Sequence, residues 1–295
     1  MKAALGGCGL ARVDAEVLLA HVVGRNRAWL IAHADDPLPE PLDAEFAGLV
    51  ARRRKGEPVA YLTGRREFHG LAIAVDPAVL IPRPETETLV EFALARLPAD
   101  RATRVLDLGT GSGAVALALA HARPLAQVLA TDRSRAAIDV ARLNAGRLGL
   151  ANVDFAYGDW YAALRARRHA MRRAKARAGS AVTAPRTFDV IVSNPPYVAE
   201  LDPHLAQGDL RFEPRRALAA GVDGLDALRA IVAGAPAHLV PGGWLVVEHG
   251  YDQARAVRAL FSAAGLGDFT AARDLAGIAR VAAGRHRTQG TATPA

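Results

Sequence analysis

The stretch RVLDLGTGSGAVALALA, residues 104–120, decides the fold. It begins as a short strand of apolar residues, passes through a turn that contains three glycines, and continues as an alanine-rich helix. Glycines allow the backbone to turn sharply and allow a ligand to approach main-chain N–H groups at the start of a helix. The stretch therefore predicts a strand, turn and helix of an α/β sheet, with room for a ligand at the turn.

Downstream of this unit, strand-like and helix-like segments alternate. Helices are expected between the strands, at residues 134–148, 225–239 and 252–264. The alternation predicts a doubly wound, mainly parallel sheet of seven strands. After the first strand at 104–108, the other six are expected at 128–131, 153–157, 188–193 and 243–248, and near 268–272 and 278–283.

The sequence before residue 76 has a different pattern of apolar residues. Apolar residues recur at helical spacing from residue 11 to 54, interrupted by three prolines between residues 37 and 41. From Pro58 to Val75 they partly alternate around Gly70, which favours a hairpin. We therefore expect three parts: a small helical domain with a hairpin linker at 1–75, the α/β domain at 76–284, and a disordered polar tail at 285–295.

Composition excludes several classes of protein. The chain has 295 residues, 51% of them hydrophobic, yet no apolar run is long enough for a membrane span. The N-terminus lacks the layout of a secretory signal. A single cysteine, Cys8, cannot form an internal disulfide, which fits a reducing compartment. We expect a cytoplasmic monomer that does not bind membranes.

The net charge of +7 lies in one segment. Eight Lys and Arg residues and no Asp or Glu fall in the region around residues 161–186, and without them the remaining chain would carry a charge of −1. Such a run is usually a solvated helix or a mobile insertion. The alternative is a patch that contacts ribosomal RNA or an acidic face of a substrate.

Acidic residues near the glycine turn favour a nucleoside with an amino-acid tail over a dinucleotide. Asp107 ends the strand before the turn, where it would repel a pyrophosphate but could accept hydrogen bonds from an ammonium group. Asp132 ends the next strand, where a carboxylate can hold both ribose hydroxyls. Asp159 and Trp160 follow the third strand and could bind an adenine amino group and cover its ring.

Each of these residues also has a simpler interpretation. Asp132 could only cap the helix that starts near Ser134, and Trp160 could be a core residue. A nicotinamide cofactor would use a similar turn. Taken together, the residues predict an adenosyl pocket across the ends of consecutive strands, lined by Asp107, Gly109, Thr110, Gly111, Ser112, Gly113, Asp132, Asp159 and Trp160.

Asn194-Pro195-Pro196-Tyr197 closes the fourth strand at the same edge of the sheet. Consecutive prolines hold the backbone extended and remove two N–H donors, so the carbonyls there can face a ligand. The Asn194 side-chain oxygen and the Pro195 carbonyl can accept both hydrogens of one NH2 group, and Tyr197 can form an aromatic wall. An ordinary strand-ending turn is the alternative. The motif predicts a methyl-accepting nitrogen site that needs no metal.

The glycine turn and Asn194–Tyr197 together resemble the class I, Rossmann-like methyltransferases that act on exocyclic or amide nitrogen. Further blocks are similar to the bacterial protein-(glutamine-N5) methyltransferases that modify peptide chain release factors. These blocks are PVAYLTG at 58–64, EF at 67–68, LIPRPETE at 80–87, EPR at 213–215, DGL at 223–225 and RDLAG at 273–277. The resemblance covers nearly the whole chain.

The resemblance implies S-adenosylmethionine as cofactor, S-adenosylhomocysteine as product, and the glutamine of a Gly-Gly-Gln motif in release factors as substrate. It implies that the helical domain recognises the protein substrate. Asn194 would touch the cofactor, while Asn194, Pro195, Pro196 and Tyr197 would hold the glutamine amide and carry the reaction. Arg83 and Glu85 would shape the pocket mouth; without the resemblance they predict only a surface ion pair in a rigid linker, and Glu85 fits a helix N-terminus.

Two rivals stay open at this point. Nucleic-acid amino-methyltransferases, which act on adenine N6 or guanine N2, also use an Asn/Asp-Pro-Pro-aromatic motif. They need extra surface to flip a base, whereas here the appended domain is small and the body is not basic. A module that only binds S-adenosylmethionine would not need Asn194–Tyr197. Glu248 and His249, after the fifth strand, are interpreted as structure at the edge of the site.

Overall fold

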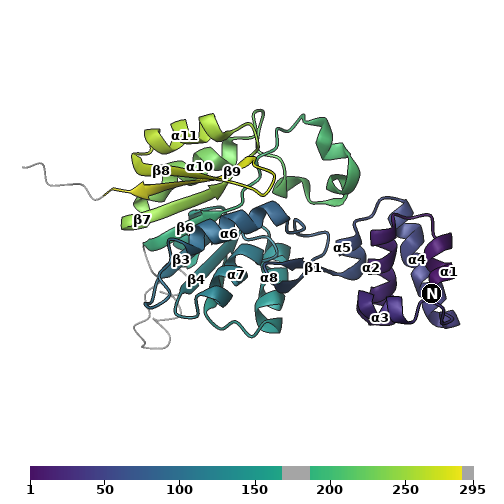
Figure 1. Ribbon diagram of the computed structural model, residues 1–295. Coiled ribbons are helices and arrows are strands. Elements are labelled where there is room, and N and C mark those ends of the chain that lie inside the picture. The colour runs from purple at the N-terminus through teal and green to yellow at the C-terminus, as the bar shows by residue number, and fades with distance from the viewer. Residues whose placement is uncertain (168–186, 288–295) are drawn as a thin grey trace, which may run out of the picture.

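The computed structural model describes residues 1–167 and 187–287. Most of the predicted basic insertion at 161–186, and the tail beyond residue 287, lie outside the described residues. A small helical unit stands beside a larger α/β unit, and a short helix and a hairpin lie between them (Figure 1). Within the described residues, no helix is long and apolar enough to cross a membrane.

The helical unit is built around its own apolar core. Leu18, Leu19 and Phe46 are buried at its centre. The Asn26 side chain accepts a hydrogen bond from the main-chain N–H of Trp29 at 2.9 Å and starts the third helix there. The helices are α1 (Lys2–Gly7), α2 (Arg12–Val23), α3 (Arg27–Ala32) and α4 (Glu40–Arg54).

The predicted hairpin is present but shorter than expected. Strands β1 (Arg65–Phe68) and β2 (Leu71–Ala74) pair antiparallel around a tight turn, in which His69 and Gly70 both have positive φ. The sequence prediction was wrong for the residues just before them, which form helix α5 (Val59–Thr63). Gly64, at φ +68°, ends that helix and lets the chain enter the hairpin.

The predicted mainly parallel, seven-stranded sheet is confirmed within the described residues. Its order is β5-β4-β3-β6-β7-β9-β8, and only β9 runs antiparallel to its neighbours. Strands β4 and β5 follow β3 on one side of it, whereas β6 lies on the other side. The direction in which strands are added to the sheet therefore reverses between β3 and β6. The strands are β3 (Arg104–Leu108), β4 (Gln127–Asp132), β5 (Val153–Tyr157), β6 (Phe188–Ser193), β7 (Leu239–Glu248), β8 (Leu266–Arg273) and β9 (Ala279–His286).

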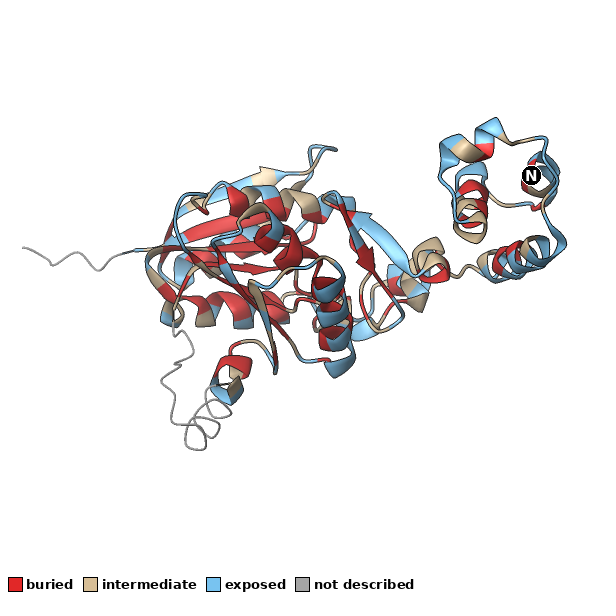
Figure 2. Cartoon of the chain, turned by 90° about the horizontal axis from the view of Figure 1, so that it is seen from below, coloured by how far each residue is buried: buried red, intermediate tan, exposed pale blue. Residues whose placement is uncertain are grey.

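Helices cover both faces of this sheet and bury its central strands, while the edge strands β5 and β8 are partly exposed (Figure 2). One apolar cluster joins one face to α6, α7 and α8, and a second joins the other face to α10 and α11. These helices are α6 (Glu87–Leu94), α7 (Ala114–Ala122), α8 (Arg135–Arg147), α10 (Asp226–Gly234) and α11 (Ala254–Ala263). Because both faces of the central strands are buried, their sequences are continuous apolar runs.

Three boundaries in the α/β unit differ from the prediction by three residues or more. The helix expected to run to residue 239 ends at Gly234, and a 3-10 turn follows it. Strand β7 begins at Leu239 instead of Gly243, with an irregularity opposite Phe188 that absorbs the Pro241-Gly242 turn. Strand β9 continues to His286, past the predicted start of the tail, because Arg285 pairs with Trp244 and donates to the Gly242 carbonyl at 3.0 Å.

Candidate active site

The glycine turn after β3 has the shape that its sequence predicts. Gly109, Gly111 and Gly113 all have positive φ, between 56° and 87°. The main-chain N–H groups of Gly109 and Thr110 both donate to the Thr131 carbonyl at 2.9 Å, which ties the turn to the end of β4. The turn is thereby fixed between two strand ends before any ligand arrives.

Asp107 is a buried carboxylate at the floor of this turn, with 1% of its surface exposed. The Thr110 hydroxyl donates to its Oδ2 at 2.6 Å. The pKa of Asp107 is raised to about 7, mainly because the carboxyl is buried; the Thr110 hydrogen bond lowers this pKa and the nearby Asp132 raises it. Within the described residues Asp107 has no salt-bridge partner, so it favours a ligand that brings a positive charge.

Asp132 connects the glycine turn to the start of α8. Its Oδ2 accepts from the N–H of Gly111 at 3.0 Å and its Oδ1 from the N–H of Ser134 at 2.7 Å. Ser134, not Asp132, caps α8 by accepting from Ala137 N–H at 3.3 Å. Burial raises the pKa of Asp132, and these two N–H donors lower it. Asp132 is therefore not the cap of α8, although its carboxylate accepts a hydrogen bond from the N–H of the capping residue, Ser134.

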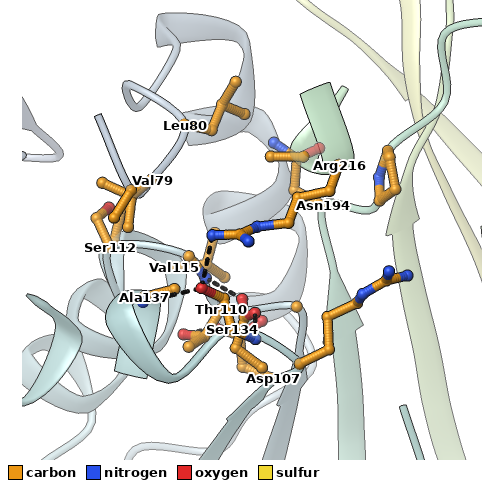
Figure 3. Close-up of a pocket in the computed structure, with 18 of the residues that line it drawn as sticks. Val79, Leu80, Asp107, Thr110, Ser112, Val115, Ser134, Ala137, Asn194 and Arg216 are labelled. Carbon is orange, nitrogen blue, oxygen red and sulfur yellow. Dashed lines mark hydrogen bonds between the residues drawn. The ribbon is translucent and has the colours of Figure 1, made fainter. Parts of the chain in front are cut away.

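A cleft opens above these carboxylates (Figure 3). Trp160 is half-buried at its wall, close enough that a Cβ added to Gly109 would lie 3.3 Å from the Trp160 ring. Arg216 crosses the cleft and donates to the Ser134 hydroxyl at 2.9 Å. Of the predicted cofactor residues, the cleft is lined by Asp107, Gly109, Thr110, Gly111, Ser112, Asp132, Asp159, Trp160 and Asn194.

Gly113 was also expected in this group but does not line the cleft. A Cβ at Gly113 would meet the Ala141 Cβ and a Leu117 methyl at 3.1 Å. Its glycine is required for the close packing of α7 on α8, so its role is structural.

A second cleft lies on the other side of Asn194–Tyr197. Asn194 and Pro196 line the first cleft, Tyr197 lines the second, and Pro195 is buried without lining either of them. The motif is therefore a wall between two clefts. The second cleft is lined by Arg83, Glu85, Tyr197, His204, Gln207, Gly208, Asp209, Leu210, Glu248 and Arg280.

The Asn194 side chain is held from one side only. Its Nδ2 donates to the Thr86 hydroxyl at 3.0 Å. Within residues 1–167 and 187–287, neither the Asn194 Oδ1 nor the Pro195 carbonyl accepts a hydrogen bond. These are the two acceptors that the sequence predicts for an NH2 group, and neither is used by another group of the described chain.

Tyr197 is anchored at both ends. Its hydroxyl donates to Glu248 Oε1 at 3.0 Å, and its carbonyl accepts from Gln253 Nε2 at 2.9 Å. Glu248 is 1% exposed, and burial raises its pKa to about 7. Burial also raises the pKa of Tyr197, so its hydroxyl stays protonated and donates.

Arg83, which lines the second cleft, makes an ion pair with a buried carboxylate that the sequence did not predict. Arg83 pairs with Glu213, and the same carboxylate accepts from Ile81 N–H at 3.0 Å. The expected Arg83–Glu85 pair is therefore wrong: Glu85 is exposed at the cleft. Burial raises the pKa of Glu213 and Arg83 lowers it. The pair fixes the segment before α6 against the loop that follows β6.

Several residues of the site were missed by sequence reasoning. Thr86 and Arg216 line the first cleft, and Arg280 lines the second. Thr86 and Glu213 lie in family-like blocks, but their roles there depend on contacts across more than 100 residues of sequence. Among the described residues, no group of three or more His, Cys, Asp or Glu side chains could hold a metal ion.

Known proteins are similar to this chain along most of its length. Residues 2–64 match a family described as the PrmC N-terminal domain, and residues 99–259 match a methyltransferase domain. The release factor glutamine methyltransferase of Xylella fastidiosa is 55% identical over 276 residues, 94% of each chain. The protein of the same name from Bordetella pertussis is 52% identical over 284 residues, 96% of this chain and 98% of that one.

A solved structure supports the fold independently. The 16S rRNA N2 G1207 methyltransferase of T. thermophilus, in complex with AdoMet and guanosine, superposes with a TM-score of 0.52. It is 22% identical, and the likeness covers 76% of this chain and 50% of that one. At this identity the likeness extends to the fold alone.

Proposed function

We propose that this chain, which belongs to the release factor glutamine methyltransferase family, methylates the side-chain amide nitrogen of the glutamine in the Gly-Gly-Gln motif of peptide chain release factors. The reaction is S-adenosylmethionine-dependent. The observation that carries the proposal is the wall formed by Asn194–Tyr197, with the cleft above Asp107 and Asp132 on one side and the second cleft on the other.

The residues of the first cleft fit the methyl donor. S-adenosylmethionine, when bound, supplies a methyl group on a positively charged sulfur, which an amide nitrogen can attack. Asp107, buried without a salt-bridge partner in the described chain, would take its ammonium group. Asp132 would hold the ribose hydroxyls with the lone pairs left over from Gly111 and Ser134. Asp159 and Trp160 would bind the adenine.

The glutamine amide would reach the wall from the second cleft. Asn194 Oδ1 and the Pro195 carbonyl would each accept one hydrogen of its NH2 group. Two such hydrogen bonds fix the plane of the amide and direct the nitrogen lone pair toward the methyl group. Tyr197 would pack against the amide, and the surplus proton would leave after transfer. Arg83 and Glu85 would contact the neighbouring backbone of the motif.

The helical unit would bind the body of the release factor. It is connected to the second cleft by two contacts: Arg53 Nη1 to Asp209 at 3.0 Å, and Arg211 Nη2 to the Lys55 carbonyl at 2.6 Å. A partner held by the helical unit would therefore lie next to the loop that borders the cleft. We expect the enzyme to act as a cytoplasmic monomer; the hypothesis of ribosome or RNA contact concerns the basic insertion, which lies outside the described residues.

The direct test is transfer of a labelled methyl group from S-adenosylmethionine. The acceptors are a purified release factor, the same factor with its Gly-Gly-Gln glutamine changed to alanine, and a ribosomal RNA control. Label in the intact factor alone supports the proposal. Label in the RNA alone would keep the cofactor site and overturn the substrate.

A further inference from the structure

Thr86 occupies a position between the reaction motif and a buried acid. It ends the 3-10 helix η1 (Pro84–Thr86), just before α6, and only 2% of its surface is exposed. On one side its hydroxyl oxygen accepts from Asn194 Nδ2 at 3.0 Å. On the other side the hydroxyl faces the Glu248 carboxyl, and this interaction lowers the Glu248 pKa. Thr86 from η1, Asn194 from the loop after β6 and Glu248 from β7 therefore form one row of polar groups.

The number of protons in this row of polar groups determines its direction. An ionised carboxylate can only accept hydrogen bonds, and a threonine hydroxyl has one proton to give. Tyr197 donates to Glu248 Oε1, while Oε2 is buried and has no geometrically well-formed partner within the described residues. The carboxylate therefore has an acceptor left for the Thr86 proton. Once Thr86 donates to Glu248, it can only accept from Asn194, which turns the NH2 group of Asn194 toward Thr86.

We propose that Thr86 and Glu248 are positioning residues that hold the Asn194 amide with its oxygen toward the substrate nitrogen. The inference rests on the proposed function, because it assigns the orientation that an NH2 substrate requires. With the amide reversed, the NH2 group of Asn194 would face the NH2 group of the glutamine, donor against donor. The fixed orientation distinguishes a site that binds a nitrogen donor from one that binds a carbonyl oxygen.

The charge state of Glu248 controls this orientation. The groups that face it are Tyr197 from the loop after β6, Arg280 from β9 and Glu85 from η1. Burial dominates and raises the pKa to about 7, while Arg280 lowers it and Glu85 raises it. When the carboxyl is protonated, it can donate to Thr86, and the Thr86 proton is then free to bind the Asn194 oxygen. Acid therefore allows the reversed amide.

The first test replaces Thr86 with valine, which has the same shape and no hydroxyl. We expect kcat for methyl transfer to the release factor to fall about tenfold, the typical effect of losing one hydrogen bond. The Kd for S-adenosylmethionine and the KM for the release factor should change less than about twofold, and Thr86→Ser should restore most of kcat. Thr103→Val is the matched control, because Thr103 is a buried threonine outside the site whose hydroxyl has no hydrogen-bond partner in the described chain.

The second test is the pH profile at saturating concentrations of both substrates. We expect kcat of the wild type to fall as the pH drops below about 7. Glu248→Gln cannot titrate, so its kcat should be lower at pH 8 and flat through this range. A wild-type kcat in Thr86→Val, or the same pH profile in the wild type and Glu248→Gln, would overturn the positioning role.

A third measurement separates this inference from the proposed function. If the wild type transfers no methyl group to any release factor, the substrate assignment fails, but the orientation of Asn194 can still be observed by NMR. The side-chain NH2 signals of Asn194, assigned with Asn194→Ala, should be protected from solvent exchange in the wild type and lose that protection in Thr86→Val. Equal exchange in the two proteins would refute the orientation claim regardless of activity.

Discussion

The two clefts on either side of Asn194–Tyr197 are built in different ways. The first cleft, which we propose binds the cofactor and call the cofactor cleft, is formed mainly by the ends of β3, β4 and β5, and main-chain N–H groups make many of its internal contacts. The second cleft, which we propose binds the substrate and call the substrate cleft, is formed by short segments near residues 83, 197, 209, 248 and 280. Side-chain pairs such as Arg83–Glu213 and Tyr197–Glu248 hold those segments together.

This difference shows how the functions of the two clefts can be separated. A cleft formed mainly by main-chain groups should keep its shape after most side-chain substitutions. Its ligand affinity should be sensitive to substitution of its few buried charged residues. A cleft built from side-chain pairs loses its shape when one partner is removed. Substitutions in the first cleft should therefore change the affinity for S-adenosylmethionine, and those in the second should change kinetic constants for the release factor.

The largest effect is expected at the wall itself. Asn194→Ala removes one of the two acceptors for the glutamine NH2 group, so kcat should fall by about 100- to 1,000-fold. The Kd for S-adenosylmethionine, measured by calorimetry, should change only a few-fold, because most of that cleft is left intact. A variant with full turnover would mean that the wall does not carry the reaction.

Asp107→Asn should be next in size and should affect the cofactor alone. The amide still accepts from Thr110 but no longer attracts an ammonium group, so the Kd for S-adenosylmethionine should rise about 10- to 100-fold. Asp159→Asn, on the exposed rim, should change it much less. Equal losses in the two variants would contradict the assignment of Asp107.

The same carboxylate makes cofactor binding depend on pH. The pKa of Asp107 is raised to about 7 by burial, and a bound cation requires its ionised form. Protonation therefore competes with binding, and the Kd should rise as the pH falls below about 7. In Asp107→Asn this dependence should disappear. Titrations at pH 6 and pH 8 on both proteins check the sign.

Glu213→Gln should damage the substrate cleft and leave the cofactor cleft unchanged. It leaves Arg83 without its charge partner and weakens the bond to Ile81, so the KM for the release factor should rise about tenfold. The free energy of unfolding should fall by about 1–3 kcal/mol. Glu57→Gln, which breaks a more exposed pair with Arg52, is the control and should cost less than about 1 kcal/mol. A comparable loss of cofactor affinity would show that the two clefts are not independent.

The smallest effect is expected where the helical unit meets the substrate cleft. Arg53 and Asp209 are partly exposed, and such pairs are worth about 1 kcal/mol or less. Arg53→Gln, on the helical side of this pair and outside the second cleft, should therefore raise the KM for an intact release factor only about threefold. A short Gly-Gly-Gln peptide should be unaffected, because it does not reach the helical unit. An equal rise in the KM for the peptide would show that the helical unit does not take part in substrate recognition.

The cofactor cleft could be predicted from the sequence much better than the substrate cleft. The strand, turn and helix around Asp107 carry local signals, namely glycines and apolar periodicity, so that fold and its cleft were expected nearly residue by residue. The wall was found because Asn194-Pro195-Pro196-Tyr197 is contiguous. By contrast, Arg83 was paired with its sequence neighbour Glu85, since nothing local indicates a partner 130 residues away. Thr86 and Glu248 were overlooked as a pair for the same reason: their relation exists only after the segment that begins α6 packs against β7.

The most direct measurement is a crystal structure of the protein with S-adenosylhomocysteine and a Gly-Gly-Gln peptide. We expect the nucleoside above Asp107 and Asp132, the peptide in the cleft with Arg83 and Glu248, and the glutamine nitrogen within hydrogen-bond distance of both Asn194 Oδ1 and the Pro195 carbonyl. A peptide bound elsewhere, or a glutamine whose oxygen faces Asn194, would contradict the account of two clefts joined through one wall.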